Sequence, residues 1–179
     1  MDQGETASGP PGVPDGLQRL WTPHRMAYLE GQGGVDPEAC PFCRAATADD
    51  DAAPLVVARG RLAFVLVNRY PYNSGHLMVL PLRHVADYTE LESAETAEIA
   101  ALTQRSMVVL RAVMAPHGFN LGMNQGAASG AGIAGHLHQH VVPRWAGDTN
   151  FLPVIAGTKA LPELVSQTRD RLAAAWSKG

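Results

Sequence analysis

Three of the seven histidines of the chain alternate with other residues, as His136, His138 and His140. Alternation with a period of two is typical of a β-strand, in which such side chains project from one face. Imidazole changes its charge near neutral pH, ligates metal ions and can act as a nucleophile. Three imidazoles on one face of a strand therefore indicate a chemical site rather than packing.

The spacing of a strand argues against one metal ion held by all three histidines. At about 3.3 Å per residue, the Cα atoms of His136 and His140 would lie roughly 13 Å apart. A Zn²⁺ ion needs each imidazole nitrogen at about 2.0–2.1 Å. The favoured hypothesis is one histidine acting as nucleophile and another as acid on a charged substrate. The alternatives are a metal site that uses two of the three histidines and a solvated strand face.

A loop of small residues runs from Asn124 to Gly132 and leads into the histidines. Its backbone N–H groups carry little shielding, which suits the oxygens of a phosphate. The loop is not a P-loop, because the Gly-Lys-Ser/Thr ending is absent. A phosphate bound by this loop would lie beside His138.

The two cysteines form a Cys-x-x-Cys pair, Cys40 and Cys43. A thioredoxin-like redox pair follows a strand and opens a helix, whereas Cys40 follows a loop rich in glycine and proline. Zn²⁺ takes four ligands in structural sites, and two cysteines with two histidines are a common set. A reduced, metal-free thiol pair is the alternative.

Composition limits the class of protein. The chain has 179 residues, of which 46% are hydrophobic and 17% charged, as in an ordinary globular protein. Its net charge of −3 gives no electrostatic reason to expect a nucleic acid or a membrane as partner. The N-terminus lacks the apolar segment of a secretory signal, and no apolar run approaches the length of ~20 residues that spans a bilayer, so we expect a cytoplasmic protein.

Hydrophobic patterning predicts the elements that position these residues. We expect residues 1–15 to be a disordered tail and residues 16–179 to form a single domain. A long helix is predicted over about 90–114, with Thr89 and Glu92 as a capping box, and a second helix at the C-terminus. Strands are predicted at 55–59, 62–67, 76–80, 119–124 and 136–142. This succession indicates an α+β fold with a five-stranded antiparallel sheet.

The segment from His136 to Val142 resembles the signature of the histidine-triad (HIT) family, His-x-His-x-His followed by two apolar residues. The resemblance covers roughly residues 40–145 and includes, in order, Cys40–Cys43, Val67–His76, Pro81–His84 and Pro143–Arg144. Trp21–Met26 and Trp145–Phe151, outside this core, resemble the bacterial branch that contains diadenosine tetraphosphate phosphorylase.

This resemblance implies nucleotidyl transfer at the α-phosphate of dinucleoside polyphosphates. By position, His138 is the nucleophile that forms a nucleotidyl-histidine, and His140 assists the leaving group. The resemblance also implies nucleotide contacts from the ribose-binding Asn68, from the phosphate-binding Asn124, and from His138 and His140 themselves. The loop residues that would hold phosphate oxygens through backbone N–H groups are Ser129, Gly130, Gly132 and Ile133.

The resemblance further implies a structural Zn²⁺ ion on Cys40, Cys43, His84 and His136, and a homodimer or higher homo-oligomer. Water as the acceptor would make the enzyme a hydrolase that releases AMP. Inorganic phosphate as co-substrate would make it a phosphorylase that yields ADP and ATP from diadenosine tetraphosphate. The flanking segments favour the phosphorylase. Hydrolysis of dinucleoside polyphosphates or nucleoside phosphoramidates is the first alternative, and a nucleotide-binding regulatory protein is the second.

Overall fold

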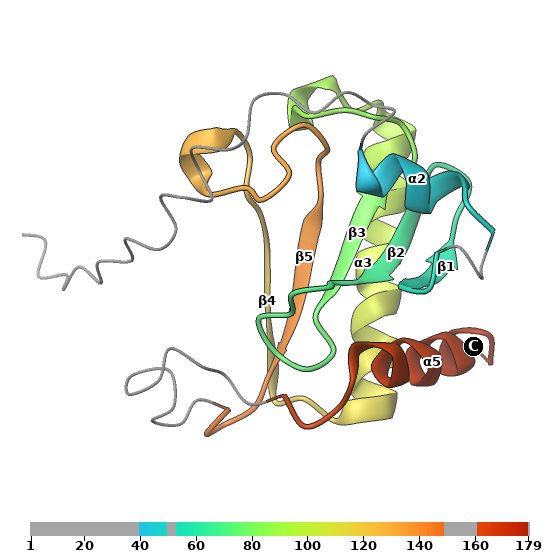
Figure 1. Cartoon of the computed structure of the whole chain (residues 1–179), viewed down its shortest axis with the longest axis vertical. Coiled ribbons are helices and arrows are strands. Elements are labelled where there is room, and N and C mark those ends of the chain that lie inside the picture. Colours follow the sequence, from blue (N-terminus) through green and yellow to red (C-terminus); the bar gives the residue numbers. More distant parts are fainter. Residues whose placement is uncertain (1–39, 50–52, 149–160, 179) are drawn as a thin grey trace, which may run out of the picture.

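Five strands form one antiparallel sheet in the computed structural model, which describes residues 40–49, 53–148 and 161–178 (Figure 1). The sheet has the order β1-β2-β3-β5-β4, so that β5 lies between β3 and the edge strand β4. The strands are β1 (Val56–Arg59), β2 (Ala63–Val67), β3 (Leu77–Pro81), β4 (Gly118–Met123) and β5 (Gln139–Arg144). The α+β fold and the antiparallel sheet are confirmed. The expected tail over residues 1–15 lies outside the described residues.

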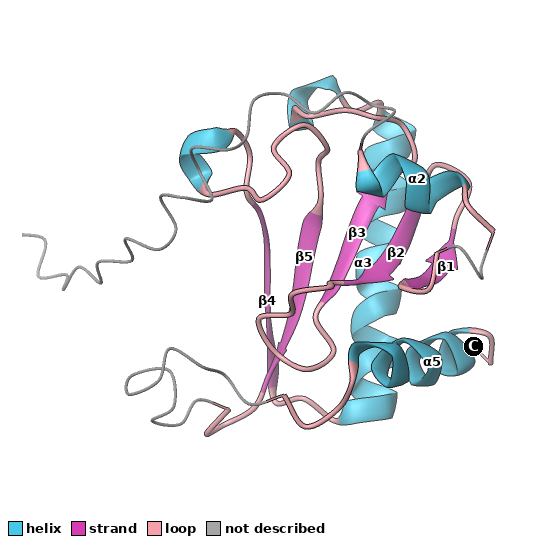
Figure 2. Ribbon diagram, viewed as in Figure 1, coloured by secondary structure: helices cyan, strands magenta, loops and turns pink. Residues whose placement is uncertain are grey.

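Helices cover both faces of the sheet (Figure 2). The long helix α3 (Ser93–Met114) and the C-terminal helix α5 (Val165–Trp176) pack on one face, and the short helix α2 (Pro41–Thr47) packs on the other. Two short 3₁₀ helices, η2 (Tyr88–Glu90) and η3 (Ala127–Ser129), lie in loops. None of the described helices is long and apolar enough to cross a membrane.

The central strands β2 and β3 feed two apolar cores, because successive side chains point to opposite faces. Val65 and Leu77 belong to the core under α3 and α5, and Phe64 and Leu80 to the core under α2. Burial of each such side chain contributes about 1.5–3 kcal/mol. The two cores hold the sheet rigid where the histidines adjoin it.

Helix α3 begins later than predicted. Asp87 accepts a hydrogen bond from the backbone N–H of Thr89 at 2.8 Å and thereby caps η2. The capping box of α3 consists instead of Glu92 and Glu95, whose carboxylate accepts from the backbone N–H of Glu92 at 2.9 Å. The predicted box at Thr89 and Glu92 is therefore wrong by three residues.

Strand β5 also begins later than predicted, at Gln139 rather than His136. Before β5, the backbone N–H of Leu137 donates to the carbonyl of Val85 at 2.7 Å. Val85 lies beyond the end of β3, so this hydrogen bond is not part of the sheet. The three histidines nevertheless lie on the same side of the sheet as α2. The ring of Phe42 lies 5.6 Å from that of His136 and 5.4 Å from that of His138.

Candidate active site and metal centre

Four residues with metal-ligating side chains converge between α2 and the start of β5. Cys40 caps the N-terminus of α2, and Cys43 lies in its first turn. His84 follows β3, and His136 precedes β5. Their ligand atoms all lie within 4.8 Å of one another. The predicted set of four is therefore brought together.

The distances within this cluster fit tetrahedral coordination. The Sγ atom of Cys43 lies 3.2 Å from Nδ1 of His84, and both sulfurs lie 3.5 Å from Nδ1 of His136. In a tetrahedral site with metal–sulfur and metal–nitrogen distances of about 2.3 and 2.05 Å, the sulfur and nitrogen ligand atoms lie about 3.6 Å apart. The four side chains can thus hold one metal ion. The cysteines do open a helix, as in a redox pair, but two histidines complete a metal site.

The hydrogen bonds around His136 prepare it as a ligand. Its Nε2 lies 3.0 Å from the carbonyl oxygen of Pro81, which can only accept, so Nε2 carries the proton and Nδ1 presents a lone pair to the sulfurs. Burial lowers the pKa of His136 to about 4, which keeps it neutral. Burial and the neighbouring Cys40 raise the pKa of Cys43 to about 11. A bound cation would replace these thiol protons.

A backbone carbonyl likewise fixes the tautomer of His138. Its Nδ1 lies 2.8 Å from the carbonyl oxygen of His136 and must donate to it. The lone pair is then on Nε2, away from that bond. Burial lowers the pKa of His138, so the ring stays neutral at physiological pH. A neutral imidazole with a free Nε2 lone pair is a competent nucleophile.

A chain of hydrogen bonds sets the opposite tautomer in His140. The backbone N–H of Tyr72 donates to Nδ1 of His76 at 3.0 Å, and the amide of Asn68 lies 3.3 Å from the same atom. The Nε2–H group of His76 therefore donates to Nδ1 of His140 at 2.9 Å. As a result, Nε2 of neutral His140 carries a proton.

That Nε2 atom of His140 has no hydrogen-bond partner, and it is the only buried side-chain nitrogen or oxygen within residues 40–49, 53–148 and 161–178 that lacks one. Leaving a buried donor unsatisfied costs about 1–3 kcal/mol. The rings of His138 and His140 lie 4.9 Å apart, edge to face. A ring that offers a nucleophilic lone pair is thus in contact with a ring that offers a free proton donor, and nucleophilic attack on a phosphorus atom uses both kinds of group.

The burial of His76 makes the stability of the fold sensitive to acid. Burial and the nearby His140 lower the pKa of His76 from 6.5 to about 3. Between these values the unfolded chain binds a proton that the folded chain does not, so stability decreases as the pH falls below 6.5. We expect His76 alone to lower the free energy of unfolding by about 2 kcal/mol between pH 7 and pH 5.

Urea unfolding at both pH values measures this effect. In His76→Gln the difference in the free energy of unfolding between pH 7 and pH 5 should be smaller than in the wild type by about 2 kcal/mol. In His117→Gln, which changes an exposed histidine, the difference should stay as in the wild type. The same pH dependence in His76→Gln and the wild type would contradict the assignment.

The residues predicted to contact the nucleotide come from several segments. Asn124 directly follows Met123, the last residue of β4, which pairs with Gln139 of β5. Asn68 reaches the site through its bond to His76. Ser129 donates its hydroxyl and its backbone N–H to the carbonyl of Gly126. Gly130, Gly132 and Ile133 follow in the loop to His136, and Ile133 packs against the core under α2.

Sequence patterning missed the surroundings of His140. The ring of Tyr72 lies 4.6 Å from that of His76 and 5.4 Å from that of His140, so it covers both. The bond between His76 and His140 joins residues 64 positions apart. This partner of His76 could not be known from the sequence without the pairing of β3 with β5.

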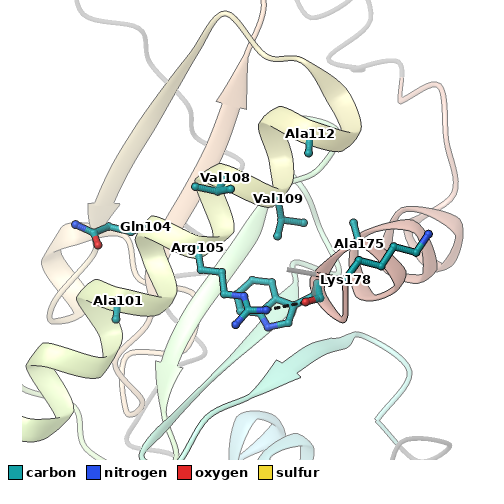
Figure 3. A pocket seen from close by; sticks show the side chains of 9 residues that line it. Ala101, Gln104, Arg105, Val108, Val109, Ala112, Ala175 and Lys178 are labelled. Carbon is teal, nitrogen blue, oxygen red and sulfur yellow. Dashed lines mark hydrogen bonds between the residues drawn. The ribbon is translucent and has the colours of Figure 1, made fainter.

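A cavity of about 510 Å³ lies away from the histidines, between α3 and the end of α5 (Figure 3). In it Arg105 lies over the ring of Trp176 at 4.9 Å and donates to the carbonyl of Trp176 at 2.7 Å. Its lining contains no histidine, cysteine or carboxylate. It offers no group for the chemistry described above.

Comparison with known proteins identifies the family. The HIT domain model matches residues 51–147, a span that contains the three alternating histidines. The AP-4-A phosphorylase of Mycobacterium tuberculosis is 47% identical over 93% of this chain and 88% of its own length. The chain belongs to the HIT family.

Other HIT relatives support the fold and the metal centre. A Zn-bound histidine triad family protein from Mycobacterium smegmatis has a TM-score of 0.64 and 26% identity, and the match covers 80% of this chain and 96% of that one. An adenylylsulfatase of Arabidopsis thaliana is 26% identical over 79% of this chain and 76% of its own length. This HIT protein therefore shares its fold with a zinc-bound relative, and the names of its relatives describe different activities.

Proposed function

We propose that this HIT protein transfers a nucleotidyl group from a dinucleoside polyphosphate through His138. One observation carries the proposal: the ring of His138, whose Nε2 holds the lone pair, lies against the ring of His140, whose Nε2–H group has no hydrogen-bond partner. Substitution at phosphorus needs a nucleophile and stabilisation of the departing oxygen, and these two atoms supply both.

In the first half-reaction, Nε2 of His138 forms a bond to the α-phosphorus, and the bond from that phosphorus to the bridging oxygen breaks. The departing oxygen accepts a hydrogen bond from Nε2 of His140, which supports its negative charge. The imidazole of His138 becomes positively charged, and the carbonyl of His136 at Nδ1 stabilises that charge. In the second half-reaction an acceptor oxygen bonds to phosphorus, and the electron pair returns to Nε2.

We propose inorganic phosphate as that acceptor and diadenosine tetraphosphate as the substrate, which gives ADP and ATP. The 47% identity to a protein named AP-4-A phosphorylase supports this choice. The test is incubation with diadenosine tetraphosphate at graded phosphate concentrations, followed by separation of the products. ADP and ATP that appear only with phosphate are expected. AMP and ATP formed without phosphate would instead identify a hydrolase.

Hydrolysis is the second candidate, because a water molecule can approach the same phosphorus. The likeness to an adenylylsulfatase shows that a relative on this fold carries another activity. Dinucleoside polyphosphates and nucleoside phosphoramidates are the substrates to compare in the same assay. Nucleotide binding without any product would favour a regulatory protein.

We propose that the nucleotide is held on the side of the sheet that carries His138 and His140. The amide of Asn68 would contact the ribose and that of Asn124 the phosphate. Backbone N–H groups of the loop before β5 would hold the oxygens that do not react. In the present conformation Ser129 uses its donors within the loop, so the contacts expected from Ser129 require that loop to rearrange.

We propose Zn²⁺ as the ion of the metal centre, with a structural role. Two thiolates and two imidazoles are a donor set that Zn²⁺ favours. Through His136, the ion would fix the backbone carbonyl that orients His138. Unpaired thiols of this kind persist in reducing compartments, which supports a cytoplasmic location. We also propose that residues 16–179 form one domain, since the described helices pack on a single sheet.

We propose that the protein is a homodimer joined through β4. Strand β4 lies at the edge of the sheet, and Leu121 on it is 48% exposed. An unpaired edge strand with an apolar side chain is suited to pair with another copy. Sedimentation should give a dimer for the wild type and a monomer for Leu121→Lys. A dimer that Leu121→Lys leaves intact would contradict this interface.

A further inference from the structure

A polar pocket of about 210 Å³ lies next to His140 and has no role in the chemistry described so far. It is lined by Tyr72, Asn73, Asn120, Val142 and Arg144. Val142 follows His140 by two residues in β5, so both project from the same face. Tyr72 lines the pocket and also contacts His140, because its ring lies against the ring of His140.

Donor groups face this pocket. Arg144 is held by Asp148, which accepts from Nε at 2.6 Å and from a terminal nitrogen at 2.9 Å. The other terminal nitrogen of Arg144 donates to the side-chain oxygen of Asn120 at 2.8 Å. Because arginine can only donate, the oxygen of Asn120 faces Arg144, and its NH₂ group is left as a donor at the pocket.

The surface over β4 beside the pocket is open. Gly122 pairs with His140 and Gly118 with Arg144, on either side of Asn120. A Cβ atom built at either glycine would meet nothing within 4 Å. The pocket volume equals that of several water molecules at about 30 Å³ each. A phosphate group can therefore extend from the α-phosphorus beside His140 into the pocket.

We propose that this pocket binds the phosphate chain of the departing nucleotide and then the inorganic phosphate that attacks nucleotidyl-His138. The inference rests on the proposed phosphorolysis. An in-line displacement places the incoming and the leaving oxygen opposite the nucleophile, so both groups use one site. An oxygen of phosphate bonds to the α-phosphorus, the bond to Nε2 of His138 breaks, and Nε2 keeps the electron pair. Because Asp148 offsets the charge of Arg144, binding is weak enough for both groups to leave.

The variant Asn120→Asp tests the pocket. It keeps the oxygen that Arg144 contacts and replaces only the NH₂ donor, with a negative charge that repels phosphate. We expect the phosphate concentration for half-maximal ADP formation to rise about tenfold or more. The rate of ADP formation at a fixed, subsaturating phosphate concentration should fall by a similar factor.

Asn120→Ala, which adds no charge, should give a smaller shift in the same direction. The control is Gln104→Glu, which adds the same charge at an exposed position of α3 on the other face and should leave the phosphate dependence unchanged. If Asn120→Asp and Asn120→Ala retain the phosphate dependence of a phosphorolytic wild type, the pocket assignment is wrong and the proposed function stands. If the wild type forms no ADP at any phosphate concentration, phosphorolysis fails and this inference fails with it.

Discussion

Replacement of His138 by alanine is expected to lower the rate of nucleotidyl transfer by at least about 10⁴-fold. The change removes the nucleophilic lone pair on Nε2, and the remaining groups cannot form the covalent intermediate. Replacement of His140 by alanine should cost less, about 10²–10³-fold, because it removes only one hydrogen-bond donor to the leaving oxygen. Steady-state turnover of diadenosine tetraphosphate with phosphate measures both effects.

The control for these variants is His117→Ala, which changes an exposed histidine outside the site and should retain turnover. Circular dichroism verifies that each variant is folded. Nucleotide binding should survive in His138→Ala, since Asn68, Asn124 and the loop before β5 are untouched. Turnover by folded His138→Ala within tenfold of the wild type would rule out the covalent route.

Loss of the metal centre is expected to have the largest effect on stability. An ion that binds only the folded chain stabilises it by about 4 kcal/mol when its free concentration is a thousand times Kd. The variant Cys40→Ser removes one ligand, while serine remains a favourable residue at the N-cap of α2. We therefore expect loss of bound zinc and a stability lower by several kcal/mol. Elemental analysis and thermal unfolding measure the two quantities.

A chelator separates the metal from other effects of this substitution. It should lower the melting temperature of the wild type nearly to that of Cys40→Ser, and it should leave Cys40→Ser unchanged. A native protein that contains no zinc and unfolds at the same temperature with and without chelator would refute the metal centre.

The sheet could be predicted from the sequence because its signals are local. Apolar runs and turn residues predicted both ends of four of the five strands to within one residue, whereas β5 begins three residues and ends two residues later than predicted. That start was misplaced because alternation alone does not show where pairing stops. Before Gln139 the backbone forms no regular strand. There the side chain of His136 binds the carbonyl of Pro81, and that of His138 binds the carbonyl of His136.

The roles of the histidines could be predicted only in part. Strand spacing showed that His136 and His140 cannot share an ion, and the structure separates them as expected. The metal ligands came from resemblance, since Cys40 and His136 are 96 positions apart. The tautomers of His136 and His140 could not be predicted, because each depends on a distant partner. The carbonyl of Pro81 determines the tautomer of His136, and the ring of His76 determines the tautomer of His140.

The most direct test of the account is the mass of the enzyme during turnover. The protein is mixed with diadenosine tetraphosphate without phosphate, quenched in alkali and digested for peptide mapping. We predict one added nucleoside monophosphate per chain, on His138, and its disappearance with release of ADP when phosphate is added before the quench. Transfer that proceeds with no adduct, or with the adduct on His140 or His136, would contradict the account.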